Sequence, residues 1–168
     1  MHWGHAVSRD LVHWEELPDA LHPDELGTIF SGSAVIDYDN PAGFNKKNEP
    51  ALVAAYTVDN PEKQRQCIAY SLDKGRTFTK YEGNPVIDSK AKWNSKDTRD
   101  PKVFWYAPGK HWVMVLNERD GHSIYNSADL KNWEYKSHVT GFWECPELFE
   151  LPVDGDKNHT KWVMYGAS

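Results

Sequence analysis

The sequence feature that most constrains the fold is a turn motif that recurs along the chain. Ser8–Trp14, Ser71–Phe78 and Ser127–Trp133 each join a Ser-x-Asp turn to an aromatic residue that begins the next strand-like run. The aspartate of such a turn can cap backbone N–H groups, and Gly75 in the middle copy can take a positive φ. We therefore expect these aspartates to hold turns rather than to do chemistry.

Short runs of strand length fill the sequence between the turns, and helical periodicity is scarce. The runs, which turn residues mostly bound, are Leu52–Val58, Gln66–Ser71, Trp112–Asn117, Ser123–Ser127 and Trp162–Gly166. A second repeat pairs Lys110–Met114 with Thr160–Met164. Roughly fifty to sixty residues per repeat, with about four strands each, is the period of a β-propeller blade. The sequence therefore predicts an all-β fold.

The repeats also predict how the chain is divided among blades. Residues 1–17 would be the last strands of one blade, about 30–87 a second blade and about 99–140 a third. Residues 143–168 would begin a fourth. Because a propeller is a closed ring, we expect residues 1–168 to be a partial propeller domain, with no second domain, that exposes strand edges a ring would cover.

Composition excludes several classes of function. The net charge of -6 argues against a nucleic-acid partner. No apolar run approaches the length of a membrane span, and the N-terminus does not have the pattern of a signal peptide. Cys67 and Cys145 define neither a disulfide framework nor a zinc site. The aromatic content of 13% suits both core packing and sugar stacking.

Charged residues at two strand boundaries are candidates for a site. Arg99 and Asp100 precede Pro101 and a run of apolar and aromatic residues. Pro101 favours an extended backbone at Asp100, which suits the mouth of a strand whose charged side chains project into a cleft. From the residues alone, a surface Arg–Asp pair and an exposed strand-end charge at Glu144 are the simpler interpretations.

Four stretches together resemble the glycoside hydrolase family of invertases, inulinases and levanases (β-fructosidases). They are, in the family's order, His2–Ser8, Phe30–Val35, Arg99–Trp105 and Trp143–Pro146. The resemblance covers essentially the whole chain and is most like levanase and exo-inulinase. It implies a five-bladed β-propeller with a trailing β-sandwich. It also implies a retaining glycosidase that releases terminal β-D-fructofuranosyl residues from levan, inulin or sucrose.

The resemblance also implies roles for particular residues. Glu144 would be the general acid/base, and Asp100 would stabilise the transition state by binding sugar hydroxyls. Arg99, Phe30 and Ser31 would bind the substrate. No cofactor or metal is implied, and the sequence leaves the oligomeric state open.

Three departures from the family pattern stand out. The family's nucleophile, an aspartate in a Trp-x-Asn-Asp-Pro-Asn-Gly motif, has no counterpart here and would lie upstream of Met1. Thr98 stands where the family usually has an aromatic residue, and Glu147 stands where it usually has aspartate. The last two put fine substrate preference in doubt more than reaction type.

The chemistry of glycoside cleavage suits these residues. It requires a proton for the leaving oxygen and negative charge near the developing oxocarbenium ion. Apolar neighbours such as Trp143 and Pro146 favour a Glu144 carboxyl that keeps its proton near neutral pH. Asp100 could accept hydrogen bonds from two adjacent furanose hydroxyls, a contact worth about 2–4 kcal/mol of transition-state binding.

Other interpretations remain open at this point. His2 and His5 could suggest a metal, but no carboxylates or cysteines gather around them, so we expect aromatic packing. Two rival functions are an arabinan- or xylan-directed glycosidase with a five-bladed propeller and a carbohydrate-binding propeller without catalysis. The levanase-like sequence favours a secreted or periplasmic location.

A first prediction concerns the chain by itself. Because its sequence lacks the nucleophile motif, the purified 168-residue chain should release no fructose from sucrose or inulin. A sensitive assay for free fructose tests this, with a complete β-fructosidase as the positive control. Turnover by the purified chain would contradict the prediction.

Overall fold

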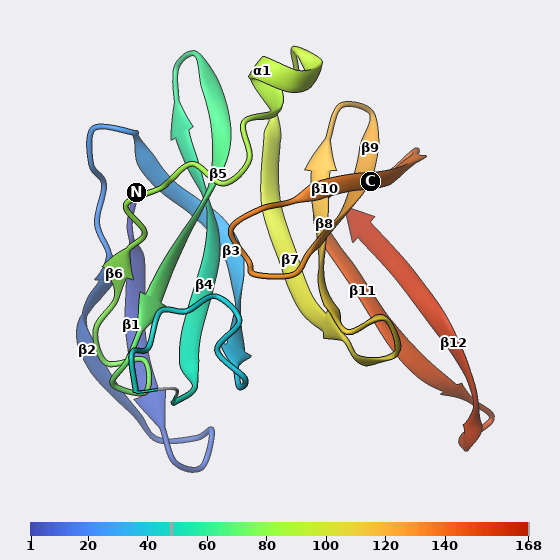
Figure 1. Ribbon diagram of the computed structural model, residues 1–168, viewed down its shortest axis with the longest axis horizontal. Helices are drawn as coiled ribbons and strands as arrows, with labels where there is room; N and C mark the ends of the chain where they lie inside the picture. Colours follow the sequence, from blue (N-terminus) through green and yellow to red (C-terminus); the bar gives the residue numbers. More distant parts are fainter. Residues whose placement is uncertain (48, 168) are drawn as a thin grey trace.

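A computed structural model describes residues 1–47 and 49–167, and its antiparallel sheets stand side by side (Figure 1). The first sheet pairs β1 (Trp3–Ser8) with β2 (Trp14–Leu21). The second has the order β3 (Thr28–Asp37), β4 (Ala51–Asn60), β5 (Lys63–Ser71), β6 (Thr79–Lys80). The third has the order β10 (Glu134–Thr140), β9 (Gly121–Ser127), β8 (His111–Glu118), β7 (Thr98–Tyr106). The fourth pairs β11 (Trp143–Val153) with β12 (Asp156–Ala167).

The predicted all-β fold is confirmed, and the successive sheets follow one another as propeller blades do (Figure 1). The second and third sheets each have four strands, as the repeats predicted. The boundary expected at residue 17 was wrong, because β2 continues to Leu21. Pro18 is tolerated inside β2 because it lies in the stretch where the ladder with β1 is interrupted, between Leu17 and Leu21.

Helical structure is confined to two short connections in the described residues. The helix α1 (Ser89–Trp93) is too short to produce a periodic sequence pattern, so the sequence did not predict it. Asp88 is its N-cap, and the Asp88 side chain accepts a hydrogen bond from the backbone N–H of Ala91 at 3.1 Å. A 3₁₀ turn occupies Ala107–Gly109. No helix within residues 1–47 and 49–167 is long and apolar enough to span a membrane.

The repeated turns are built as the sequence predicted. Each aspartate accepts two backbone N–H groups: Val12 and His13 for Asp10, Arg76 and Thr77 for Asp73, Lys131 and Asn132 for Asp129. The residue that follows each aspartate has a left-handed backbone, with φ of 64°, 63° and 62° at Leu11, Lys74 and Leu130. The hydroxyl and backbone N–H of Thr77 hold the pKa of Asp73 well below its usual range. These carboxylates are therefore committed to turns.

The hydrophobic core lies between neighbouring sheets. Successive side chains of β4 point to opposite faces, so Val53 and Ala55 pack with Met114 and other residues of the third sheet. Tyr56 and Val58 pack in a second cluster with residues of the first sheet. The second sheet is therefore buried on both faces, and this packing fixes how the sheets stand relative to one another.

A second prediction follows from this packing. Met114 is 0% exposed between the second and third sheets, so Met114→Ala should lower the free energy of unfolding by about 2–5 kcal/mol. Val139 of the same sheet is 38% exposed, and Val139→Ala should stay within about 0.5 kcal/mol of the unsubstituted protein. Urea unfolding measures both. Equal effects would contradict a core placed between the sheets.

Candidate active site

Three interrupted strands bring the candidate residues together. β3, β7 and β11 each lie at the end of their own sheet, and β7 packs beside both β3 and β11. The register of each ladder shifts once near the start of the strand: between Ile29 and Gly32, between Arg99 and Lys102, and between Trp143 and Glu147. Such β-bulges redirect side chains and are common beside active sites. They carry the residues that the sequence singled out.

The bulges hold the two candidate carboxylates in an unusual backbone conformation. Asp100 has a φ of 61°, and Glu144 and Cys145 have φ of 26° and 45°. The extended backbone expected at Asp100 was therefore wrong, because the bulge rather than Pro101 sets its conformation. Non-glycine residues held in sparsely populated backbone regions cost about 1–3 kcal/mol each and need support from surrounding structure.

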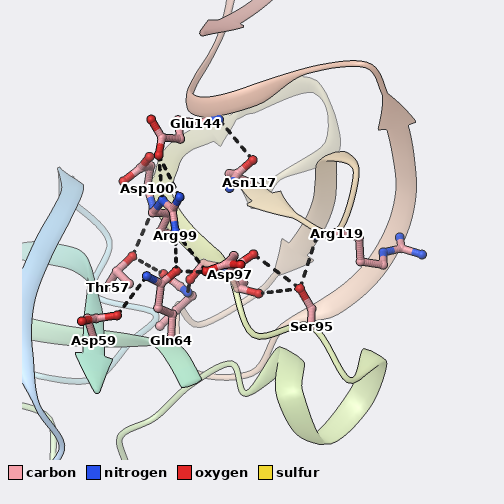
Figure 2. A network of polar contacts seen from close by, with 12 residues as sticks. Thr57, Asp59, Gln64, Ser95, Asp97, Arg99, Asp100, Asn117, Arg119 and Glu144 are labelled. Carbon is pink, nitrogen blue, oxygen red and sulfur yellow. Dashed lines mark hydrogen bonds and ion pairs between the residues drawn. The ribbon is translucent and has the colours of Figure 1, made fainter. Parts of the chain in front are cut away.

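Arg99 joins the third sheet to the fourth. Its Nε and Nη2 atoms donate to Glu144 Oε1 at 3.1 and 2.8 Å, and its Nη1 donates to Gln64 Oε1 at 3.0 Å (Figure 2). Burial alone would lower the pKa of the guanidinium, but the hydrogen bond and charge of Glu144, with Asp97 and Asp100, raise it above its ordinary value. Arg99 is therefore a fixed positive charge beside the Glu144 carboxylate.

Asp100 makes the reciprocal connection. Its Oδ2 accepts the backbone N–H of Cys145 at 2.9 Å and lies 3.7 Å from the Cys145 thiol. Its own backbone N–H donates to Thr57 Oγ1 at 3.1 Å. Burial and the charge of Asp100 raise the pKa of the Cys145 thiol, which disfavours the nucleophilic thiolate form.

A cavity of about 390 Å³ opens at the same place. Its walls are Ser31, Gly32, Ser33, Asp100, Pro101, Lys102, Cys145, Pro146, Glu147 and Tyr165. The second, third and fourth sheets thus contribute one bulge each. A larger cavity of about 620 Å³ lies at the other ends of β3 and β7, where neither Asp100 nor Glu144 reaches it. The smaller cavity is the candidate active site because Asp100 lines it together with residues of the bulges in β3 and β11.

The five candidate residues do not all line the cavity. Ser31 and Asp100 line it. Arg99 and Glu144 do not line it, but hydrogen bonds between β7 and β11 hold them beside Asp100 and Cys145, which do. Phe30 does not line the cavity, and its carbonyl accepts the indole N–H of Trp3 at 2.8 Å.

The two histidines near the N-terminus make ordinary contacts. The His2 ring lies 3.2 Å from the Asp19 carboxylate, and His5 packs edge-on against Phe78. Within the described residues, no group of three or more His, Cys, Asp or Glu side chains could hold a metal ion. The aromatic packing expected of the histidines therefore applies to His5, while the His2 ring lies near both the Asp19 carboxylate and the His22 ring, whose centroid is 6.3 Å away.

The two substitutions relative to the family pattern have different surroundings. Thr98 is 0% exposed, its N–H donates to Gln64 Oε1 at 2.9 Å, and its hydroxyl donates to Ser95 at 3.1 Å. Its side chain therefore faces the interior, away from the cavity. Glu147 lines the cavity and pairs with Lys102 at 2.7 Å, so it is the substitution that faces a ligand.

Sequence reasoning missed the side chains that support the two carboxylates. Besides Gln64, they are Thr57, which receives the Asp100 N–H, and Asn117, whose Oδ1 receives the Glu144 N–H at 3.1 Å. Each ends an alternating apolar row, Val53 and Ala55 before Thr57 and Val113 and Val115 before Asn117. A buried polar residue that ends such a row is the signal that could have found them.

Comparison with known proteins identifies one family and several relatives that are similar over nearly the whole chain. The chain matches the family described as glycosyl hydrolases family 32 N-terminal domain over residues 1–167. It is 60% identical to a levanase from Bacillus subtilis, over 98% of this chain and 25% of the levanase. The structure of a fructofuranosidase from Schwanniomyces occidentalis complexed with fructose is similar, with a TM-score of 0.85 and 43% identity over 97% of this chain.

An exo-inulinase from Aspergillus awamori has a TM-score of 0.86 and 40% identity over 97% of this chain. The chain covers 33% of the fructofuranosidase and 37% of the exo-inulinase. It therefore spans between a quarter and somewhat over a third of the length of the relatives it matches.

A third prediction tests the electrostatics of the site. Since the negative charge of Asp100 helps to raise the pKa of the Cys145 thiol, Asp100→Asn should lower that pKa and speed alkylation by iodoacetamide at pH 8 severalfold. Cys67 is the internal control, because it is 0% exposed and burial raises its pKa to about 12. Mass spectrometry of each cysteine peptide gives the rates. An unchanged rate at Cys145 would contradict the contact.

Proposed function

Because the chain belongs to glycosyl hydrolase family 32, we propose that the whole protein hydrolyses terminal β-D-fructofuranosyl bonds of levan, inulin or sucrose with retention of configuration. In this proposal Glu144 is the general acid/base and Asp100 stabilises the transition state. Ser31 lines the substrate site, Arg99 adjoins it through its hydrogen bond to Glu144, and Phe30 is proposed to belong to it as the neighbour of Ser31, although it does not line the cavity. The nucleophilic carboxylate has no counterpart in this sequence.

One observation carries the proposal: β7 and β11 hold each other's carboxylates. Arg99 donates to Glu144 Oε1 (Figure 2), and the backbone N–H of Cys145 donates to Asp100 Oδ2. Among the described residues, none donates a hydrogen bond to the other oxygen of either carboxylate. Each carboxylate thus uses one oxygen for structure and has a second one for a sugar.

The chemistry then follows from these positions. Glu144 donates its proton to the glycosidic oxygen as the bond from that oxygen to the anomeric carbon breaks and its electron pair leaves with the oxygen, while the nucleophilic carboxylate bonds to the anomeric carbon. The resulting Glu144 carboxylate lies 2.8 Å from the Arg99 guanidinium, which stabilises it. In the second step it takes a proton from the water that attacks the anomeric carbon, while the bond from that carbon to the nucleophilic carboxylate breaks. Asp100 accepts hydrogen bonds from furanose hydroxyls as positive charge develops on the ring.

The competing functions make different predictions. A carbohydrate-binding propeller without catalysis would bind fructose in the whole protein and release none from sucrose. An arabinan- or xylan-directed glycosidase would cleave those polymers. Family membership favours the fructosidase over the arabinan- or xylan-directed enzyme.

A fourth prediction tests the acid role of Glu144 in the whole protein. Glu144→Gln should lower kcat/KM on sucrose by about 100- to 10,000-fold, because the leaving oxygen is no longer protonated. The loss should be much smaller on an aryl β-fructofuranoside, whose acidic phenol leaves without a proton. Equal losses on both substrates would remove Glu144 from this role.

Asp100→Asn is the matched control. It removes one charge from the neighbouring bulge and should lower kcat/KM by about 100- to 1,000-fold on both substrates alike. Circular dichroism should show an unchanged fold for both variants. Near-normal rates in the Asp100 variant would remove Asp100 from transition-state stabilisation.

A further inference from the structure

The backbone of each strained carboxylate residue is held by a side chain from the preceding sheet. The Asp100 N–H donates to Thr57 Oγ1 at 3.1 Å, and Thr57 lies on β4 of the second sheet. The Glu144 N–H donates to Asn117 Oδ1 at 3.1 Å, and Asn117 lies on β8 of the third sheet (Figure 2). Both supporting side chains are 0% exposed, so neither faces the cavity or solvent.

The two supports occupy equivalent places. Each belongs to the second strand of its sheet, counted from the strand that carries the bulge. Each ends an apolar row that faces the next sheet. Across the ladder, Thr57 pairs with Gln66 on the third strand, and Asn117 pairs with His122 on the third strand. The backbone support at Asp100 is therefore repeated at Glu144, whereas the hydrogen bond from Thr57 to Gln66 has no counterpart between Asn117 and His122 among the described residues.

The hydroxyl of Thr57 is oriented by its neighbour. It donates its own proton to Gln66 Oε1 at 2.8 Å, which leaves its lone pairs for the Asp100 N–H. Gln66 in turn donates from Nε2 to the Thr98 carbonyl at 2.7 Å. The second sheet therefore holds the backbone on both sides of Arg99.

Asn117 is directly opposite Arg99 on one side and His122 on the other. His122 is 0% exposed and stacks on Phe142, with ring centroids 5.1 Å apart. A side chain at Gly166 would meet the His122 ring at 2.5 Å and the carbonyls of Trp143 and Glu144 at 2.9 and 3.0 Å. Only glycine allows β12 to approach so closely, so β12 packs directly against the backbone carbonyls of Trp143 and Glu144.

From this repeated geometry we propose that Asn117 and Thr57 are positioning residues for catalysis. Asn117 fixes the backbone of the acid/base Glu144, and Thr57 fixes that of Asp100. The proposal rests on the proposed function, since it assigns a catalytic consequence to contacts with those two residues. It makes each carboxylate depend on a different sheet, and this dependence can be measured.

The fifth prediction concerns Asn117 in the whole protein. Asn117→Ala removes the acceptor, and misplacing the acid should lower kcat/KM on sucrose by about 10- to 100-fold. The loss on an aryl β-fructofuranoside should be much smaller, as for Glu144→Gln. In the Glu144→Gln background, Asn117→Ala should cost no more than about twofold further, because the acid is already absent.

The same pair of substrates and a double variant test Thr57, but here the loss should not depend on the leaving group. Thr57→Val keeps the shape and removes the hydroxyl, so both substrates should lose activity alike, by about 10- to 100-fold. This loss should vanish in the Asp100→Asn background, and Thr57→Ser, which keeps the hydroxyl, should retain the activity.

Asn117→Leu provides a second variant that fills the space of the amide if Asn117→Ala does not fold.

Two substitutions outside the site serve as controls. Asn45→Leu alters a buried amide in the connection between β3 and β4, and Thr28→Val alters a partly buried hydroxyl of β3; both lie outside the site and should leave both rates unchanged. Losses at Asn117 or Thr57 that add fully to those of Glu144→Gln or Asp100→Asn would show a general structural role and overturn the proposal. If the unsubstituted protein releases no fructose, the proposed function fails instead, which is a distinguishable result.

Discussion

The site depends on a reciprocal connection between two strands that are far apart in the sequence. Arg99 on β7 donates to Glu144 on β11, and the backbone of Cys145 on β11 donates to Asp100 on β7. Hydrogen bonds to ionised groups are roughly twice as strong as neutral ones, and each of these involves a charged partner. Without β7, the Glu144 carboxylate would lose its Arg99 partner, and without β11, Asp100 would lose the backbone N–H of Cys145, so each bulge supports the other.

This connection requires that the sheets stand at a fixed distance, which the apolar packing between them provides. Val53 and Ala55 face the third sheet, and Val113 and Val115 lie on the opposite face of the third sheet from Met114. The same rows end in polar side chains where the neighbouring bulge begins. Packing therefore sets the position from which Thr57 and Asn117 reach the strained backbone.

Much of this could be predicted from the sequence because it depends on local patterns. Alternating runs gave the strands, and the Ser-x-Asp motif gave turns such as the one capped by Asp73. The supports at Thr57 and Asn117 could not be placed, because their roles depend on which sheet faces which bulge. The burial of Thr98 could not be predicted for the same reason: its backbone N–H donates to Gln64 of another sheet, and its hydroxyl donates to Ser95.

The conformation at Asp100 shows how tertiary structure prevails over a local preference. Pro101 disfavours the helical region of backbone angles for the preceding residue and favours an extended one. Asp100 nevertheless has a left-handed φ of 61°. The strained residue receives a hydrogen bond on its carboxylate from Cys145 and gives one from its N–H to Thr57. Two partners on two other sheets thus offset a cost of about 1–3 kcal/mol. Because those partners hold the backbone and one carboxylate oxygen, the remaining oxygen points where the bulge directs it, and the strain is what gives the residue a fixed direction.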